Sequence, residues 1–187
     1  MTRAISAAML LCMAATACAT STEPVEIPAN EIPFPLERAE ASAAPGVQEH
    51  SFKVMMVRGR RLVSVRRTEV SALPLPELAV RALLVGPTES ELARGLSTAI
   101  PSTARLLDVQ VFDDTVAEVN LSQGFQAAAP SEGFLLRVAQ VVTTLTGVRR
   151  ITAVRFSIDG EVASVPTDRG EIVQRPVAAA DYARRLR

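Results

Sequence analysis

Residues that usually carry metal or redox chemistry are scarce in this chain of 187 residues, which has one histidine, two cysteines and no tryptophan. A structural zinc site takes four nitrogen or sulfur ligands, so neither a metal nor a cofactor is expected. Lys53 is the only lysine, and the 20 basic side chains are balanced by 20 acidic ones. A neutral chain lacks the strongly basic surface typical of nucleic-acid binders, so nucleic acid is not an expected partner.

Long hydrophobic runs are also missing. The apolar stretch from Ala4 to Ala17 is shorter than the roughly 20 residues that cross a bilayer. It follows Arg3, as the apolar part of a secretory signal follows a positive residue, so residues 1–17 are predicted to be a signal peptide. The sequence Ala15-Thr16-Ala17-Cys18 resembles the lipobox at which bacterial lipoproteins are cleaved and acylated. The alternative is ordinary cleavage after Ala17, which would release a secreted protein.

The cysteines favour the lipoprotein alternative. Cys12 lies inside the predicted signal, so Cys18 would be the only cysteine of the exported chain. An unpaired cysteine in an exported protein needs a reason, and acylation supplies one. The lipobox implies a diacylglyceryl group on Cys18, which would anchor the protein to the cell membrane at its extracytoplasmic face. No metal or catalytic role is expected for either cysteine.

Residues 18–49 are predicted to be a tether rich in proline and glutamate. Proline cannot donate a backbone hydrogen bond and keeps the preceding residue out of helical conformations. Such a segment is extended and would hold a domain away from the membrane. The alternative is an arm that docks on the domain through Ile27, Ile32, Phe34 and Leu36.

The predicted domain covers residues 50–166, and its first half alternates strands and helices. Apolar residues with a period of two predict strands at 52–57 and 60–67, joined by a turn at Arg58-Gly59. A helix is predicted from Pro76 to the Gly86-Pro87 stop. Thr88 and Glu91 then form a capping-box pattern that opens a short helix. A second hairpin is predicted from 106–112 and 116–121.

The second half adds a helix and a last hairpin. Apolar residues line one side of a helix that ends at Gly147, and they are Phe134, Leu135, Val138, Ala139, Val142 and Leu145. Strands are predicted at 151–158 and 161–165, joined by Asp159-Gly160, whose residue types suit a type I′ turn. The order ββ-α-ββ-α-ββ predicts the α+β class: a two-layer sandwich with two main helices on one face of a mainly antiparallel sheet.

Residues 167–187 form a C-terminal extension. It contains Tyr182 and ends in a run of arginines. It could pack Tyr182 on the domain as a short helix, and the alternative is a disordered tail. The family resemblance described below favours packing, because its members often carry a similar stretch from Pro176-Val to Asp-Tyr182.

The strongest local charge feature is a group of five arginines, which are Arg58, Arg60, Arg61, Arg66 and Arg67. Simple alternation would put Arg58, Arg60 and Arg66 on one face of the hairpin and the other two on the opposite face. Forked guanidinium donors suit phosphate or carboxylate, so one hypothesis is a receptor for a lipid head group, a wall polymer or an acidic protein. The alternative is a solvated strand face.

Catalytic groups are not expected. His50 has no neighbouring partner that would make it a general base. Asp113, Asp114 and Asp159 fall at turns, where aspartate bonds the local backbone. Serines have neither a second histidine nor a nucleophile elbow beside them, so the chain is predicted not to be an enzyme.

Three segments together resemble the GerMN domains of spore-germination proteins. They are Ala82-Leu-Leu-Val-Gly-Pro-Thr88 with Gly95-Leu96, then Val119-Asn-Leu-Ser122 with Phe125, and finally Arg137 to Leu145 leading into Val154-Arg-Phe-Ser-Ile-Asp-Gly160. The resemblance spans about residues 50–166. It implies a bacterial envelope lipoprotein of the sporulation or germination type, whose domain is an interaction or scaffold module without catalytic residues. It also implies an envelope protein partner or self-association, since similar modules build rings or accompany membrane sensors.

Overall fold

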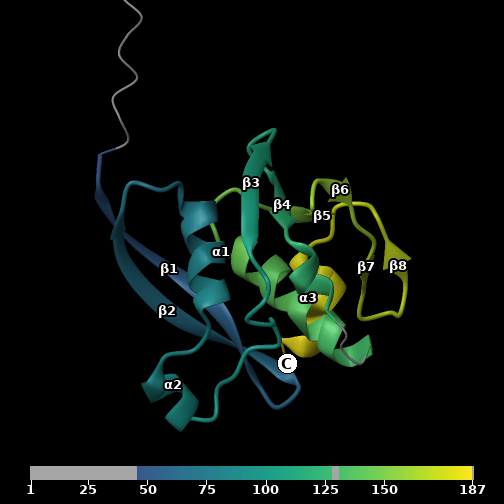
Figure 1. Cartoon of the computed structure of the whole chain (residues 1–187), viewed down its shortest axis with the longest axis horizontal. Helices are drawn as coiled ribbons and strands as arrows, with labels where there is room; N and C mark the ends of the chain where they lie inside the picture. The colour runs from purple at the N-terminus through teal and green to yellow at the C-terminus, as the bar shows by residue number, and fades with distance from the viewer. Residues whose placement is uncertain (1–45, 128–130, 187) are drawn as a thin grey trace, which may run out of the picture. The chain divides into compact units, whose positions relative to one another are not determined.

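The computed structural model describes residues 46–127 and 131–186, and its first elements are two long strands. β1 (Gln48–Arg58) and β2 (Arg61–Ser71) form an antiparallel hairpin whose register is unbroken along its length (Figure 1). β2 continues past its predicted end at residue 67, because residues 68–71 also pair with residues of β1. The period of two buries one set of β1 side chains, namely Phe52, Val54 and Met56.

Two helices follow the hairpin. α1 (Leu75–Val85) has Pro76 in its first turn and ends before Gly86, as its sequence predicts. It packs against β1, and its buried residues are Leu78, Ala79, Val80, Ala82 and Leu83. The short α2 (Glu89–Ala93) begins after Thr88.

A four-stranded sheet contains β3 (Leu106–Phe112), β4 (Val116–Leu121), β5 (Ala153–Ile158) and β6 (Glu161–Val162), in that order. β4 and β5 run parallel, whereas the other two pairs are antiparallel. The turn between β5 and β6 has positive φ at Asp159 (47°) and Gly160 (88°), which confirms the predicted turn conformation.

The α+β class is confirmed, but the strands do not form one sheet. They are divided among three sheets, the hairpin β1–β2, the four-stranded sheet and a small pair described below. The prediction treated strands as hairpin neighbours. β4 and β5 are instead joined through a long helix, and a helical crossover allows two neighbouring strands to run parallel.

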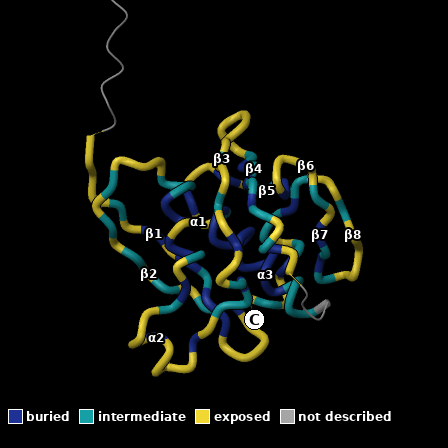
Figure 2. Tube along the Cα trace, viewed as in Figure 1, coloured by how far each residue is buried: buried dark blue, intermediate teal, exposed yellow. Residues whose placement is uncertain are grey.

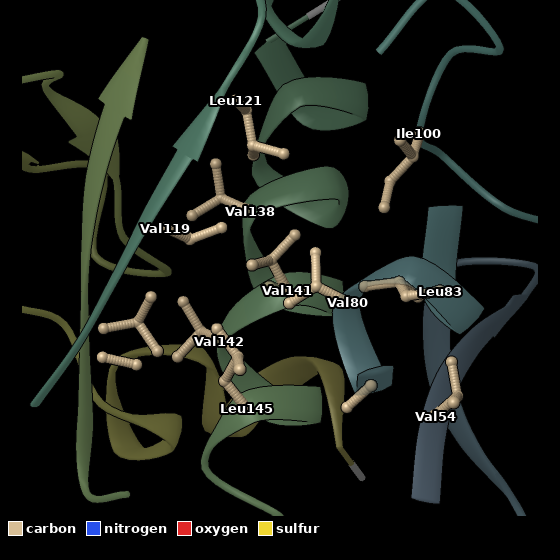
Figure 3. Close-up of a cluster of buried hydrophobic side chains, with 14 of the residues drawn as sticks. Val54, Val80, Leu83, Ile100, Val119, Leu121, Val138, Val141, Val142 and Leu145 are labelled. Atoms are coloured by element: carbon tan, nitrogen blue, oxygen red, sulfur yellow. The ribbon is translucent and has the colours of Figure 1, made fainter. Parts of the chain in front are cut away.

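That helix, α3 (Ser131–Leu145), occupies the centre of the domain. Figure 3 shows it between β4 on one side and α1 with β1 on the other. Every residue from 136 to 145 is buried, so the expected one-sided apolar stripe describes only part of the helix. A helix covered on all sides must satisfy its polar side chains internally.

The C-terminal extension completes the core. β7 (Val165–Pro166) pairs with β8 (Ile172–Val173), and Val177 forms an antiparallel bridge with Val154 of β5. The 3-10 segment η3 (Ala179–Arg185) then packs on α3. Tyr182 is completely buried, as expected from a packed tail, whereas residues 169–171 in the loop between β7 and β8 are exposed (Figure 2).

The predicted signal, Cys18 and residues 18–45 of the predicted tether lie outside the described residues. Among the helices of residues 46–127 and 131–186, none is long and apolar enough to span a membrane.

Candidate functional site

The register of the β1–β2 hairpin places the five arginines on other faces than the sequence alternation predicts. Arg58 lies opposite Arg61, and Phe52 lies opposite Arg67, so these arginines share the face that also carries Phe52. Arg66 lies opposite Lys53 on the other face. The expected distribution was wrong because the two-residue turn changes which positions of the second strand share a face with the first.

Arg67 is held by a carboxylate. Its guanidinium bonds both oxygens of Glu91, with Nη2 at 2.6 Å from Oε2, and it also donates to the Gly86 carbonyl. Oε2 of Glu91 accepts the Thr88 N–H at 2.9 Å, which is one half of the predicted capping box. Glu91 is only 3% exposed. Arg67 therefore fastens α2 and its preceding loop to β2.

These contacts shift the pKa values of both partners. The hydrogen bond from Arg67 lowers the Glu91 pKa from 4.5 to about 2, although burial opposes this change. The hydrogen bond to Glu91 raises the pKa of Arg67. The pair is therefore ionised at neutral pH and contributes to stability there.

Glu91→Gln is expected to destabilise the domain by about 3 kcal/mol at neutral pH, because it leaves Arg67 buried without its counter-ion. In the wild type the same contribution is present above pH 4.5 and is lost as pH falls towards about 2, since the folded pKa is the lower one. Urea unfolding measured across this pH range should give a flatter profile for the variant.

Glu77→Gln is the matched control. Glu77 pairs with Arg81 one helical turn away at 2.7 Å, on the exposed side of α1. Its loss should cost less than about 0.5 kcal/mol. Equal costs for the two variants, or unchanged pH dependence in Glu91→Gln, would contradict the assigned role of Glu91.

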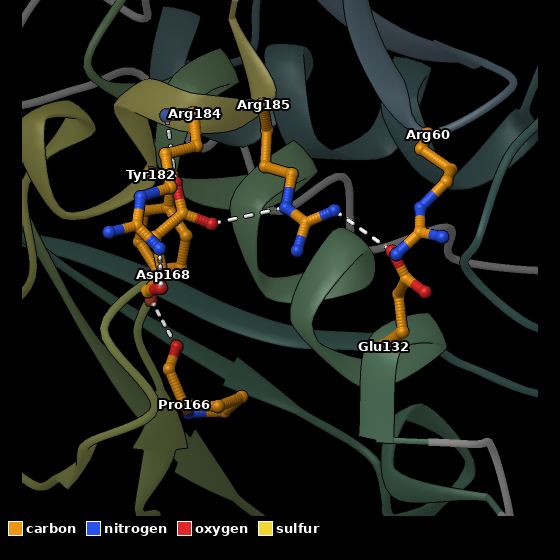
Figure 4. Close-up of polar contacts among 7 residues, drawn as sticks. All are labelled: Arg60, Glu132, Pro166, Asp168, Tyr182, Arg184 and Arg185. Atoms are coloured by element: carbon orange, nitrogen blue, oxygen red, sulfur yellow. Dashed lines mark hydrogen bonds and ion pairs between the residues drawn. The ribbon is translucent and has the colours of Figure 1, made fainter.

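Arg60 belongs to a second network, which joins the hairpin turn to the C-terminal extension (Figure 4). Its Nη2 lies 2.5 Å from Oε1 of Glu132, at the start of α3. The same oxygen accepts Nη1 of Arg185 at 3.0 Å, and Nε of Arg185 lies 3.1 Å from Oδ1 of Asp168. Asp168 also accepts the Arg184 N–H at 2.9 Å. Three segments distant in sequence therefore meet at Glu132 and Asp168.

The electrostatics of Glu132 follow from this arrangement. Desolvation alone would raise its pKa, but the hydrogen bond from Arg185 and the charge of Arg60 together lower it. Glu132 is therefore ionised at neutral pH and forms ion pairs with both Arg60 and Arg185.

The remaining arginines of the group are exposed. Arg58 and Arg61 lie at the turn end of the hairpin. Arg66 and Lys53 border a hollow of about 260 Å³ whose other lining residues are Ser51, Phe52 and Gly147. Among the described residues, two of the five arginines, Arg60 and Arg67, thus make ion pairs and the other three make none. Their role in binding an anionic partner stays a prediction.

Sequence analysis missed a polar set on the buried helix. Arg137 donates to the carbonyls of Ala99, Phe125 and Ala127, and its guanidinium carbon lies 5.8 Å from the Phe125 ring centroid. Burial lowers the pKa of Arg137. The spacing of Arg137, Gln140 and Thr144 places them on one helical face, a pattern that could have indicated this set.

Gln140 and Thr144 close the edge of β1. Gln140 donates to the Met55 carbonyl at 2.9 Å and accepts the Ala99 N–H at 2.8 Å. The Thr144 hydroxyl accepts the Met55 N–H at 3.0 Å. At Met55, the backbone groups of β1 that point away from β2 are thus satisfied by side chains of α3.

The other candidate residues lie where the sequence suggested. His50 is in β1, and Asp113, Asp114 and Asp159 are turn residues with positive φ. Within residues 46–127 and 131–186, no group of three or more histidine, cysteine, aspartate or glutamate side chains is arranged to hold a metal ion.

Comparisons with known proteins match the same domain. A family model described as Germane, sporulation and spore germination, matches residues 49–164. The tandem GerMN domains of the Bacillus subtilis sporulation protein GerM give a TM-score of 0.53 at 20% identity, over 71% of this chain and 47% of that chain. The first GerMN domain of that protein gives 0.52 at 22% identity, over 70% and 98%.

A third structure is a Clostridium perfringens protein described as a candidate lipoprotein. Its TM-score is 0.50 at 17% identity, over 76% of this chain and 94% of that chain. The present chain thus covers about half of the tandem structure and nearly all of a single GerMN domain. No curated protein matches the sequence. At these identities the structural likeness establishes the fold.

Proposed function

This chain belongs to the Germane family of sporulation and spore germination, as its resemblance to GerMN domains predicts, and on that premise we propose that it is a non-catalytic interaction module of the bacterial cell envelope. The observation that carries the proposal is the family match, which covers residues 49–164. The two proteins of known structure named above are a sporulation protein and a candidate lipoprotein, and both descriptions fit an envelope role.

The carboxylates with shifted pKa values are in intramolecular ion pairs, which fits the proposal of a non-catalytic domain. Glu91 is bonded to Arg67, and Asp181 is bonded to Arg175 at 2.9 Å. Hydrogen bonding by Arg175 lowers the Asp181 pKa, just as Arg67 lowers that of Glu91. These shifted carboxylates hold segments of the fold together, so their pKa values are explained without a reaction.

Display at the membrane completes the proposal. Acylation of Cys18 would fix the chain to the extracytoplasmic face of the cell membrane, and residues 19–45 would separate the domain from the lipid surface. An interaction module in that position meets envelope proteins, including other copies of itself.

The second candidate function is a receptor for an anionic envelope component. The observation that favours it is the hollow bordered by Lys53 and Arg66, because two neighbouring cations there face solvent. Arg58 and Arg61 would add charge at the turn. This binding would be mainly electrostatic and therefore sensitive to salt.

One experiment separates the two candidates. The full chain, expressed in its own bacterium, is cross-linked in living cells, and its partners are recovered with low-salt and high-salt washes. The matched variant carries Arg58→Gln and Arg66→Gln, which are exposed arginines on opposite faces of the hairpin. Under our proposal the same proteins are recovered from both chains and survive high salt. Loss of capture in the variant and in high salt would favour the anionic receptor, and no captured protein under any condition would contradict the interaction role.

A further inference from the structure

One long strand edge has no partner strand among the residues that the structure describes. The backbone N–H and C=O of Val57 both bond to Ser97, and those of Met55 bond to side chains of α3. The backbone groups of odd-numbered β1 residues therefore point away from β2. Even-numbered β1 residues therefore bond to β2, which leaves the backbone groups of Leu62, Ser64, Arg66, Thr68 and Val70 on the outer edge. These groups make no hydrogen bond to other residues within 46–127 and 131–186.

The edge of β2 lacks the usual structural protection. β3, at the edge of the four-stranded sheet, has a register shift between Leu106 and Asp108, and such a bulge discourages further pairing. β2 has neither a bulge, a proline nor a glycine, and Ser64, Arg66, Thr68 and Val70 are exposed. Its arginines are the one feature that restricts which strand can join it.

Charge selects how a second copy would align. Three symmetric antiparallel alignments of β2 with itself pair at least nine of its 11 residues and match the outward residues, and they are centred on Val65, Arg66 and Arg67. The alignments centred on the arginines place two like charges face to face, which is destabilising. The alignment centred on Val65 instead places Arg61 opposite Glu69 of the second copy, and symmetry makes this contact twice.

Both members of that pair are available. Arg61 is exposed and Glu69 is half-buried on the same face of β2. Within the described part of the chain, neither of them makes an ion pair with another residue. Arg66 would lie opposite Ser64 of the second copy, and Arg67 opposite Val63, so no arginine faces another arginine.

We propose that two copies of this chain associate by antiparallel pairing of their β2 edges, with Val65 at the symmetry axis and Arg61 opposite Glu69 of the second copy. This proposal deepens the proposed interaction role by naming a partner, a second copy, and it is independent of any other envelope protein that the module binds.

Disulfide trapping tests the alignment. Val65 would form a non-hydrogen-bonded pair with its own copy, at a Cα separation of about 4.5 Å, which a disulfide can bridge. The full chain carrying Cys12→Ser, Cys18→Ser and Val65→Cys has no other cysteine and should therefore become a covalent dimer under mild oxidation. Thr68→Cys in the same background is the control, because Thr68 is more exposed but would lie several residues from its copy. Cross-linking of Thr68→Cys equal to or above that of Val65→Cys would overturn the alignment.

Charge reversal gives a second measurement with Val65 intact. By sedimentation of the Cys18→Ser chain, Arg61→Glu should weaken dimerisation about tenfold, and Arg61→Glu with Glu69→Arg should restore it. Arg169→Glu, a charge reversal in the exposed loop between β7 and β8, should leave it unchanged. The dimer would be refuted if the parent chain were monomeric, or if Arg61→Glu and Arg169→Glu had equal effects. Capture of other envelope proteins would remain a separate result.

Discussion

A Cys18→Ser variant is expected to move almost completely from the membrane fraction to the soluble fraction. The thioether that would carry the diacylglyceryl group needs the cysteine sulfur, and serine cannot replace it. Each buried methylene contributes about 0.8 kcal/mol to membrane binding, so loss of two acyl chains removes the anchor entirely. Fractionation of the bacterium followed by immunodetection measures the change, and labelling with palmitate reports the lipid directly.

Cys12→Ser is the natural control, because this second cysteine lies inside the predicted signal. It should stay in the membrane fraction and incorporate palmitate as the wild type does. A wild-type chain that is already soluble and unlabelled would instead show ordinary cleavage after Ala17. An uncut precursor among cytosolic proteins would contradict export itself.

Local patterns in the sequence predicted most individual elements. Strand alternation in β1, the Pro76 start of α1 and the Asp159-Gly160 turn all depend on residues close together in the chain. Their periodicity or turn chemistry is therefore visible without the fold. The same holds for the motifs that carried the resemblance to the family.

Features that depend on distant residues were not predicted. The parallel pairing of β4 with β5 follows from the path of α3 across the domain, which no single segment encodes. Arg67 and Glu91 lie in different elements, and only the folded chain brings their charges together. Arg137 is satisfied by three backbone carbonyls, and carbonyls occur at every residue, so its partners leave no mark in the sequence.

The arginine group shows the same difference between what nearby residues predict and what only the fold determines. The arginine cluster was evident from the sequence, but its division into paired and exposed members depends on the register of the hairpin and on Glu132 and Glu91. The open edge of β2 could not be predicted either, because an edge is defined by the absence of a neighbouring strand among the described residues.

Tyr182→Ala is expected to destabilise the domain by about 4 kcal/mol. Its side chain is fully buried, and its hydroxyl donates to the Pro166 carbonyl at 2.9 Å. Removing a large buried ring leaves a cavity and an unsatisfied carbonyl. Tyr182→Phe keeps the ring and should cost only about 1 kcal/mol. Leu186→Ala, at a site that is 43% exposed, should be nearly neutral, and urea unfolding followed by circular dichroism ranks the three.

The chain supplies its own probe for this prediction. Tyr182 is the only tyrosine and there is no tryptophan, so tyrosine fluorescence reports on the C-terminal extension alone. Because Arg185 bonds the extension to Glu132 of α3, the fluorescence and circular dichroism transitions of the wild type should coincide. An earlier fluorescence transition, together with a small cost for Tyr182→Ala, would mean that the extension unfolds independently and that the core does not depend on it.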